Sequence, residues 1–388
     1  MLCTSNWYNI VQLDVIKLFT LTSNMKFYCY ISLFVSTILI CNCSNIEKPV
    51  GEKVTRLMDE NMPPLLQLNL TKVDLLEEER IAFFRVYCDS ILVINKTYTN
   101  DSFLLSIINF KNHALIGNYL KKGNGPNELL QFTGINNQNR VLVQDIVKKQ
   151  ISIFNIDSAI LYGQLYKPIL RSMEGRDFAH FDLLTDTSLV FYNPWHLKNC
   201  GNIANENAPE LLVSGLNGIF EYTPQKDIGF VANEARVHVI SNIEKNRVFL
   251  AYRGIPQFSL LDSNLDTIKI ICGPDAIKKR NYKYENSNGN IYNSVKNIYS
   301  SCIYSTNNTI FVDNERITGM SMRDFMNFTD ANSINLRELY SFDWNGNLIA
   351  RYQLPIKPYA ISFSEATNVL YITAKDKNDD FILYKAQL

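Results

Sequence analysis

Short apolar runs separated by polar residues make up most of the chain from residue 65 onward. The runs are rich in Val, Ile, Phe and Tyr, and Asn, Asp and Gly interrupt them. Few windows show the spacing of an amphipathic helix. This alternation predicts short strands joined by tight turns, as in a sandwich, barrel or propeller. Because the strands continue to residue 388 without a domain linker, the length favours a propeller.

Three segments share one pattern: an apolar strand, an Asp or Asn turn, and a strand that resumes at Leu or Ile. They cover residues 150–157, 257–266 and 339–348. The third contains Asn345-Gly346, a strong signal for a two-residue hairpin. Each segment is therefore predicted to be an outer hairpin of a propeller blade.

Grouping neighbouring strands predicts an all-β, six-bladed β-propeller over residues 65–388. The expected blades cover residues 82–122, 132–170, 178–222, 236–272, 295–354 and 359–388. The last blade has only three strands. A spare strand at residues 65–70 is predicted to complete it and close the ring, which leaves no open sheet edge. Residues 274–294 and 320–335 are predicted to be inserted loops, the second with a helical turn.

The N-terminal part has the pattern of an export signal. Met25-Lys26 gives a positive start, and residues 27–40 carry no charge. A run of this length suits the apolar core of a signal peptide and is too short for a membrane-spanning helix. We assign residues 25–42 to the signal peptide. Residues 1–24 are interpreted as an upstream start that was assigned wrongly. Residues 43–64 are polar, end in two prolines and are predicted to be a tether.

The end of the apolar run resembles the lipobox of bacterial lipoproteins. Cys43 is followed by Ser44 and Asn45, and the resemblance implies that its thiol carries lipid. Asn42 stands where Gly, Ala or Ser is usual, but the other cysteine, Cys41, follows Ile and fits less well. The expected location is the cell envelope, exported and lipid-anchored to a bacterial membrane on its periplasmic or surface face. Plain secretion, an uncleaved anchor helix and a buried N-terminal strand are the alternatives.

Composition narrows the possible partners. The chain has 38 basic and 38 acidic side chains, and this balance argues against broad nucleic-acid binding. It leaves glycans, peptides and proteins open. After Cys43 the cysteines are scattered and form no C-x-x-C pair, so no zinc or redox site is predicted. They are either buried free thiols or form one or two disulfides, and they are Cys88, Cys200, Cys272 and Cys302.

The most distinctive short run is Gly-Asn-Gly-Pro-Asn-Glu at residues 123–128. No Lys-Ser or Lys-Thr follows it, so it is not a phosphate-binding loop. Gly123 and Gly125 permit unusual backbone angles and Pro126 fixes its own, which predicts a tight structural turn. Glu128 is expected to accept backbone N–H groups there. A contribution of Glu128 to a ligand surface is the alternative.

With this turn, the lipobox-like start and the repeated strands, the chain resembles the TolB-like six-bladed propeller lipoproteins. The resemblance covers residues 43–388 and is specific only at Gly123, Gly125, Pro126 and Glu128. Asn127 departs from the second glycine that is common there. The resemblance implies a six-bladed propeller, export and a lipid anchor. The activity of the family is unassigned, so it implies no catalytic residues.

Catalytic patterns are poor. The chain has four histidines and contains neither H-E-x-x-H nor G-x-S-x-G. A propeller hydrolase or lyase would use carboxylates around an axial metal, and Asp145, Asp182 and Asp313 are strand-end acids of that kind. Such acids are also common in propeller turns. We therefore predict no metal, no cofactor and no catalytic residue.

Four residues are weak candidates for ligand binding. Trp195 and His196 follow a strand, where the indole could stack on a sugar or cap a channel, although rim packing also explains them. Arg253 follows another apolar strand and could point into the channel or into solvent. Glu128 is the fourth. The sequence thus predicts a binding or scaffold protein for a peptide, glycan or partner protein; the alternative is a propeller hydrolase or lyase with an axial metal.

Overall fold

The structure is a computed structural model of the 388-residue chain. Apart from short gaps inside several ranges, it describes residues 54–74, 81–96, 102–129, 134–172, 180–192, 200–203, 237–252, 257–273, 282–284, 291–293, 297–298, 303–318 and 336–388. The predictions for the signal peptide, for Cys43 and for residues 320–335 lie outside this part of the chain.

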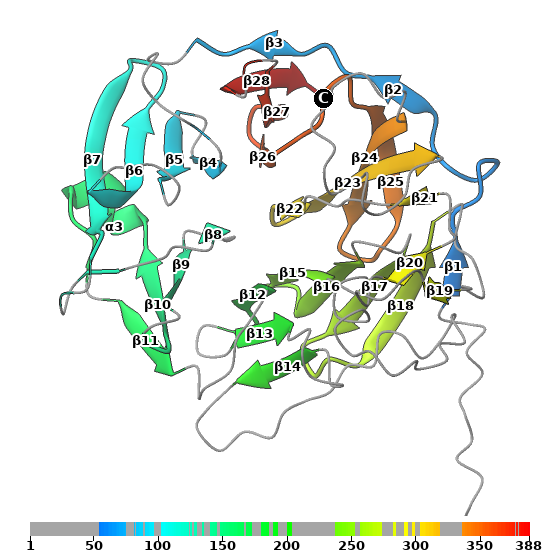
Figure 1. Ribbon diagram of the computed structural model, residues 1–388, viewed down its shortest axis with the longest axis horizontal. Coiled ribbons are helices and arrows are strands. Elements are labelled where there is room, and N and C mark those ends of the chain that lie inside the picture. Colours follow the sequence, from blue (N-terminus) through cyan, green and yellow to red (C-terminus); the bar gives the residue numbers. More distant parts are fainter. Residues whose placement is uncertain are drawn as a thin grey trace, which may run out of the picture. The chain divides into compact units, whose positions relative to one another are not determined.

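The described chain folds into antiparallel sheets whose main strands follow one another in chain order (Figure 1). Each sheet is named here by one of its strands. The β4 sheet contains β4 (Phe83–Tyr87), β5 (Ile91–Asn95), β6 (Phe103–Asn109) and β7 (Ala114–Lys121). The β8 sheet contains β8 (Gly134–Ile135), β9 (Arg140–Asp145), β10 (Gln150–Asn155) and β11 (Ile169–Ser172). The β12 sheet contains β12 (His180–Leu183), β13 (Leu189–Tyr192) and β14 (Cys200–Ile203).

The second half repeats this arrangement. The β15 sheet contains β15 (Val237–Asn242), β16 (Arg247–Tyr252), β17 (Gln257–Asp262) and β18 (Thr267–Cys272). The β23 sheet contains β21 (Asn297–Ile298), β22 (Ile303–Ser305), β23 (Thr309–Thr318), β24 (Leu336–Asp343) and β25 (Leu348–Gln353). The β26 sheet contains β26 (Ala360–Ser364), β27 (Val369–Lys375) and β28 (Phe381–Gln387). Five sheets have four or more strands once the N-terminal strands described below are included.

Burial explains why the strands are almost continuously apolar. All five residues of β5 are buried, as are all five of β26, so both faces of these strands are covered. The outer strand β7 has only exposed and partly buried positions. Strands covered on both faces need apolar side chains at successive positions, not only at alternate ones. The apolar runs of the sequence are therefore the inner strands of face-packed sheets.

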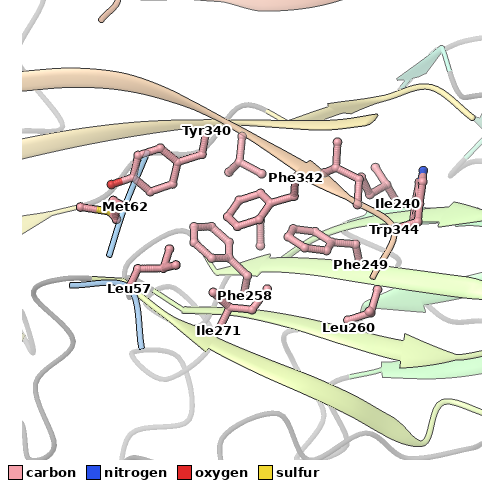
Figure 2. Close-up of a cluster of buried hydrophobic side chains, with 13 residues drawn as sticks. Leu57, Met62, Ile240, Phe249, Phe258, Leu260, Ile271, Tyr340, Phe342 and Trp344 are labelled. Carbon is pink, nitrogen blue, oxygen red and sulfur yellow. The ribbon is translucent and has the colours of Figure 1, made fainter. Parts of the chain in front are cut away.

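Clusters of buried side chains join each sheet to the next. The largest lies between the β15 and β23 sheets, where the rings of Phe249 and Phe258 lie 5.6 and 5.2 Å from that of Phe342 (Figure 2). Trp344 belongs to this cluster, and its indole N–H donates to the Thr306 carbonyl at 3.0 Å. First strands also contact one another, and β26 of the last sheet contacts β4 of the first. Sheets of sequential strands packed face to face in this way form an all-β β-propeller, as predicted.

The N-terminal segment adds an outer strand to three different sheets. β1 (Val54–Arg56) pairs in parallel with β18, β2 (Leu65–Gln67) pairs in parallel with β25, and β3 (Thr71–Lys72) pairs antiparallel with β28. The prediction that the strand at residues 65–70 completes the last sheet was therefore wrong. Leu65–Gln67 pairs with β25 of the preceding sheet, and Thr71–Lys72 pairs with β28 of the last sheet instead. The predicted tether is also shortened, since the chain joins the sheets from Val54 onward.

Two of the three predicted hairpins are confirmed, at β17–β18 and β24–β25. The second has a loop of four residues instead of two, because the Asp343 N–H donates to the Asn347 carbonyl and Gly346 takes a left-handed φ of 73°. After β10 the expected tight turn is replaced by a helix, α3 (Asp157–Tyr162), although β10 still pairs antiparallel with the next strand, β11. The helix ends at Gly163, whose φ of 68° suits a glycine C-cap.

Two further expectations can be compared with the fold. Within residues 274–294, β19 (Tyr282–Tyr284) and β20 (Ile291–Asn293) form a small antiparallel hairpin. Cys272 is a buried free thiol, and its burial raises the thiol pKa. This agrees with the buried-thiol interpretation at that position. In the part of the chain that the structure describes, no helix is long and apolar enough to span a bilayer.

Candidate functional site

The guanidinium group of Arg85 and the ring of Tyr304 form a cation–π contact between two different sheets. Arg85 lies in β4 and Tyr304 in β22, and the guanidinium carbon of Arg85 lies 5.1 Å from the centroid of the Tyr304 ring. Both side chains are about nine-tenths buried. Since β26, in the last sheet, contacts both β4 and β22, the pair spans from one side of the β26 sheet to the other. A cation over a ring face is stabilised by the quadrupole of the ring.

Hydrogen bonds to β26 hold this pair in place. The Tyr304 hydroxyl donates to the Phe363 carbonyl at 3.3 Å, and the Val86 N–H donates to Ser362 Oγ at 2.9 Å. Ser362 is fully buried, so losing its hydroxyl would leave a buried N–H without this acceptor. The strands that carry Arg85 and Tyr304 are thus both fixed to the same neighbour.

A buried carboxyl group lies on another first strand. Asp182 in β12 is 2% exposed; it accepts the N–H of Ser241 in β15 at 2.8 Å and also the N–H of Leu183. The Ser241 hydroxyl donates to the Leu183 carbonyl, which closes the link between the two sheets. Burial raises the pKa of Asp182 to about 7, although both backbone hydrogen bonds and the positive charge of Arg85 act to lower it.

These groups define the candidate site, which we call the inner-strand cluster: Arg85, Asp182, Ser241 and Tyr304. It combines a fixed positive charge, an aromatic face, hydroxyl groups and a carboxyl group whose charge changes near neutral pH. Such a set suits recognition of a polar or charged group by stacking and hydrogen bonding.

A second polar arrangement surrounds the Gly123–Glu128 turn. The Glu128 carboxylate accepts the Gly125 N–H at 2.9 Å and pairs with Lys121 Nζ at 2.9 Å. The hydrogen bond and charge of Lys121, together with the Gly125 N–H, lower the pKa of Glu128. A Cβ on Gly123 would lie 2.1 Å from Glu128 Oε2, so a larger residue would displace the carboxylate that closes the turn, and the φ of 154° at Gly123 also disfavours other residues.

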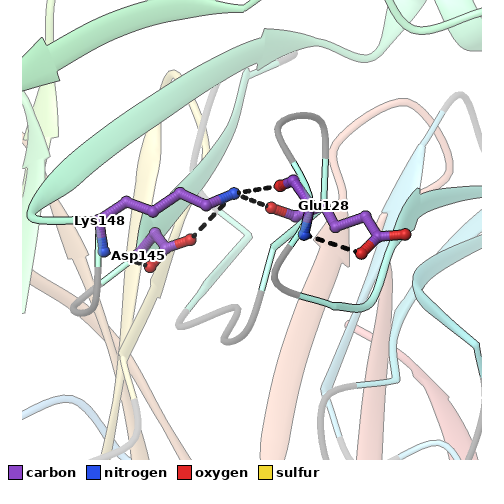
Figure 3. Close-up of polar contacts among 4 residues, drawn as sticks. Glu128, Asp145 and Lys148 are labelled. Carbon is purple, nitrogen blue, oxygen red and sulfur yellow. Dashed lines mark hydrogen bonds and ion pairs between the residues drawn. The ribbon is translucent and has the colours of Figure 1, made fainter.

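Lys148, from the β9–β10 hairpin, fixes this turn from outside (Figure 3). Its Nζ donates to the carbonyls of Gly125, at 2.9 Å, and Glu128, and lies 3.9 Å from Asp145 Oδ2. The Glu128 carboxylate thus accepts a backbone N–H of the turn, as the sequence predicts, while residues 124, 126 and 127 lie outside the described chain.

The other predicted ligand residues cannot be compared with this geometry. Trp195 and His196 fall between β13 and β14, and Arg253 follows β16; with Pro126, they lie outside the described residues. Glu128 belongs to the turn described above. The residues of the inner-strand cluster were not predicted as ligand-binding residues, and Asp182 appeared only as a possible metal ligand. The available signal was a single charged residue inside an apolar strand, as in Phe-Phe-Arg-Val-Tyr at Arg85.

The three acids considered for an axial metal belong to different sheets. Asp145 ends β9, Asp182 lies in β12 and Asp313 lies in β23. Among the described residues, no group of three or more His, Cys, Asp or Glu side chains is arranged to hold a metal ion.

Comparisons with known proteins support the fold alone. A member of the DUF4221 family from Bacteroides vulgatus matches with a TM-score of 0.54 at 11% identity, over 84% of this chain and 97% of its own. A Bacteroides fragilis protein described as exported matches with a TM-score of 0.46 at 10% identity, over 86% and 99%. The β-propeller domain of Swd1 from Myceliophteria thermophila gives 0.40 at 9% identity, over 82% and 99%. No protein-family model and no curated protein matches this sequence, so the fold is assigned without a family.

Proposed function

We propose that this protein is an exported, lipid-anchored β-propeller that binds a ligand and acts as a binding or scaffold protein. The observation that carries the binding role is the inner-strand cluster, in which Arg85 stacks on Tyr304 near the buried carboxyl group of Asp182. The ligand is a peptide, a glycan or a partner protein with a polar or charged group that this set can recognise.

The proposal includes six blades and kinship to the TolB-like propeller lipoproteins. Six clusters of buried side chains, each shared by two consecutive sheets or by the last and the first, support this number. The closed turn at Gly123, Gly125 and Glu128 supports the kinship, since it is the specific part of the resemblance.

Export and anchoring rest on the sequence of residues 25–43. The test is metabolic labelling with palmitate of the wild type, Cys43→Ser and the control Cys41→Ser. We expect Cys43→Ser to abolish the label and Cys41→Ser to keep it, because only one thiol receives the lipid. Label that survives in Cys43→Ser would show that Cys43 is not the anchor.

Binding is tested with purified protein on glycan and peptide arrays. Arg85→Lys keeps the charge but removes the flat guanidinium face, so we expect the affinity for array ligands to fall by roughly tenfold. Arg247→Lys is the matched control, since Arg247 lies in β16 and its guanidinium donates to the adjacent Asn246 carbonyl. Equal loss in both variants, or no loss in either, would argue against the inner-strand cluster as the site.

A further inference from the structure

The inner-strand cluster holds one buried cation and one buried carboxyl group. Arg85 is 9% exposed and Asp182 is 2% exposed, so water screens neither group well. Burial raises the pKa of Asp182 to about 7, and the positive charge of Arg85 acts in the opposite direction. The cluster is therefore positively charged while Asp182 keeps its proton, and it becomes neutral when Asp182 ionises.

The strands packed against β12 leave Arg85 as the described charged group that acts on Asp182. Two backbone N–H groups, one of them from Ser241 in β15, donate to the carboxyl oxygens. His238, the titratable residue of β15, is three positions from Ser241 and so lies on the opposite face of that strand. The described side chains of β13 are aliphatic, and the side chain of His180 in β12 lies outside the described part. Among the described side chains, an entering ligand would therefore meet the charges of Arg85 and Asp182.

The shape of the guanidinium group favours a planar anion. Its N–H donors form a flat fork that matches a carboxylate or a phosphate, and it lies 5.1 Å from the centroid of the Tyr304 ring. A phosphate monoester carries nearly two negative charges at neutral pH, whereas Arg85 supplies a single positive charge. A carboxylate has one negative charge, which Arg85 can compensate in full. The cluster therefore suits a carboxylate better than a phosphate.

The burial of Tyr304 separates an acidic peptide from an acidic glycan. Its ring is 9% exposed and Arg85 lies over it, so no wide aromatic surface is open to a sugar ring. The carboxylate of a uronic acid is attached directly to such a ring, and the ring would have to enter with it. In glutamate or aspartate the carboxylate ends a slender chain of methylene groups, which needs far less room. A peptide side chain is therefore the better match.

We propose that the inner-strand cluster binds the side-chain carboxylate of a glutamate or aspartate in a partner peptide, and that Asp182 is protonated when it does so. This identifies the ligand of the proposed function and rests on that function. Arg85 pairs with the entering carboxylate and stays beside Tyr304. An ionised Asp182 would compete for the same cation and repel the ligand, so the peptide binds less tightly once Asp182 has lost its proton.

The test compares peptides that differ by a single charge. A peptide array presents each glutamate peptide beside a partner with Gln in its place, and glycans with and without uronic acids are printed on the same slide. The purified full chain is applied at about pH 6. The dissociation constants of the strongest pair are then measured by fluorescence anisotropy at about pH 6 and about pH 8. Arg85→Gln removes the positive charge of the cluster, and Arg247→Gln is the matched control, because Arg247 lies in β16 and donates to the adjacent Asn246 carbonyl.

We expect the wild type to bind the glutamate peptide at least about tenfold more tightly than its Gln partner at about pH 6, because only glutamate pairs with Arg85. Between about pH 6 and about pH 8 this affinity should fall by up to about tenfold, since Asp182 then loses its proton. Arg85→Gln should lose the preference for glutamate, and Arg247→Gln should keep it. Asp182→Asn should bind the glutamate peptide with an affinity that does not change over this range.

Equal affinity for the two peptides of a pair in the wild type would overturn the proposal, and so would a stronger signal from uronic-acid glycans than from any peptide. This comparison needs no variant, so it holds even if Arg85→Gln does not fold. Wild-type affinity that does not change with pH, or a fall that persists in Asp182→Asn, would overturn the role of Asp182. Binding of neutral peptides or glycans that still requires Arg85 would leave the proposed function intact, whereas absence of binding on every array would remove both.

Discussion

At the scale of single residues, Lys148 makes the contacts that join the Gly123–Glu128 turn to the neighbouring hairpin. Its ammonium group bonds two carbonyls of the turn and pairs with Asp145, which is fully buried. We expect Lys148→Met to lower the free energy of unfolding by about 2 kcal/mol, because the two carbonyls lose a charged donor. Chemical denaturation followed by circular dichroism measures this.

Lys149→Met is the control for that change. Lys149 is the next residue and is exposed, so its loss should alter stability by less than about 0.5 kcal/mol. If the two variants were equally stable, Lys148 would not hold the turn.

Asp182 predicts a dependence of stability on pH. Burial raises its folded-state pKa to about 7 from the usual value of 3.8, so between these values the folded protein keeps a proton that the unfolded chain has lost. This contribution to stability is therefore present below about pH 4 and is lost as the pH rises through about 7. Asp182→Asn does not titrate. The stability of the wild type relative to this variant should fall by up to roughly 4 kcal/mol between about pH 4 and about pH 8.

Denaturation of both proteins at several pH values tests this. The side chain of Asn has one oxygen and cannot accept both backbone N–H groups as the two carboxylate oxygens do, so Asp182→Asn lowers the free energy of unfolding by an amount that does not depend on pH. This amount cancels when the stability of the variant at one pH is compared with its stability at another. A wild-type-to-variant difference that does not change with pH would show that Asp182 stays ionised in the fold.

At the scale of elements, the N-terminal strands are part of the folded body. The Leu57 N–H donates to the Cys272 carbonyl at 2.8 Å, and its side chain is buried against the β15 and β23 sheets. Leu57→Ala should therefore cost about 2–4 kcal/mol through the cavity it leaves. Its neighbour Met58 is 47% exposed, so Met58→Ala should be nearly neutral. Thermal unfolding of both variants measures the difference. Equal midpoints would favour the prediction that residues 54–64 are a tether and not part of the folded body.

The sequence predicted those elements whose signals are local. The β17–β18 and β24–β25 hairpins follow from Asp262 and Asp343, each of which accepts N–H groups two and four residues ahead. The helix α3 was missed because a single helical turn follows an apolar strand without a break. The pairing of β1 with β18 could not be predicted, since its partners are more than 200 residues apart.

The inner-strand cluster could not be predicted from the sequence for the same reason. Arg85 and Tyr304 come from strands far apart in the chain, and the charged residue inside the apolar strand β4 does not indicate its partner. Only packing of the sheets brings them together. In the Gly123–Glu128 turn, the hydrogen bond from the Gly125 N–H to the Glu128 carboxylate was predictable because it joins residues only three positions apart.

At the scale of the whole molecule, consecutive sheets share buried clusters, and the last sheet packs on the first. Leu92 in β5 is fully buried in the cluster that contains Tyr371 and Leu383 of the β26 sheet. A sheet that loses one such side chain weakens the cluster it shares with its neighbour. Unfolding should then spread from sheet to sheet in one cooperative step.

Leu92→Ala tests this cooperativity. We expect a loss of about 2–5 kcal/mol and an equal shift of the unfolding midpoints seen by circular dichroism and by tryptophan fluorescence, to which Trp344 in the distant β15–β23 cluster contributes. Leu115→Ala in β7, where the side chain is 54% exposed, is the control and should leave both midpoints in place. If only the circular dichroism midpoint moved, the β23 sheet would unfold independently of the β4 sheet. Coincident midpoints would mean that the contact of β26 with β4 transmits stability around the propeller, so that any ligand held by Arg85 and Tyr304 would stabilise every sheet at once.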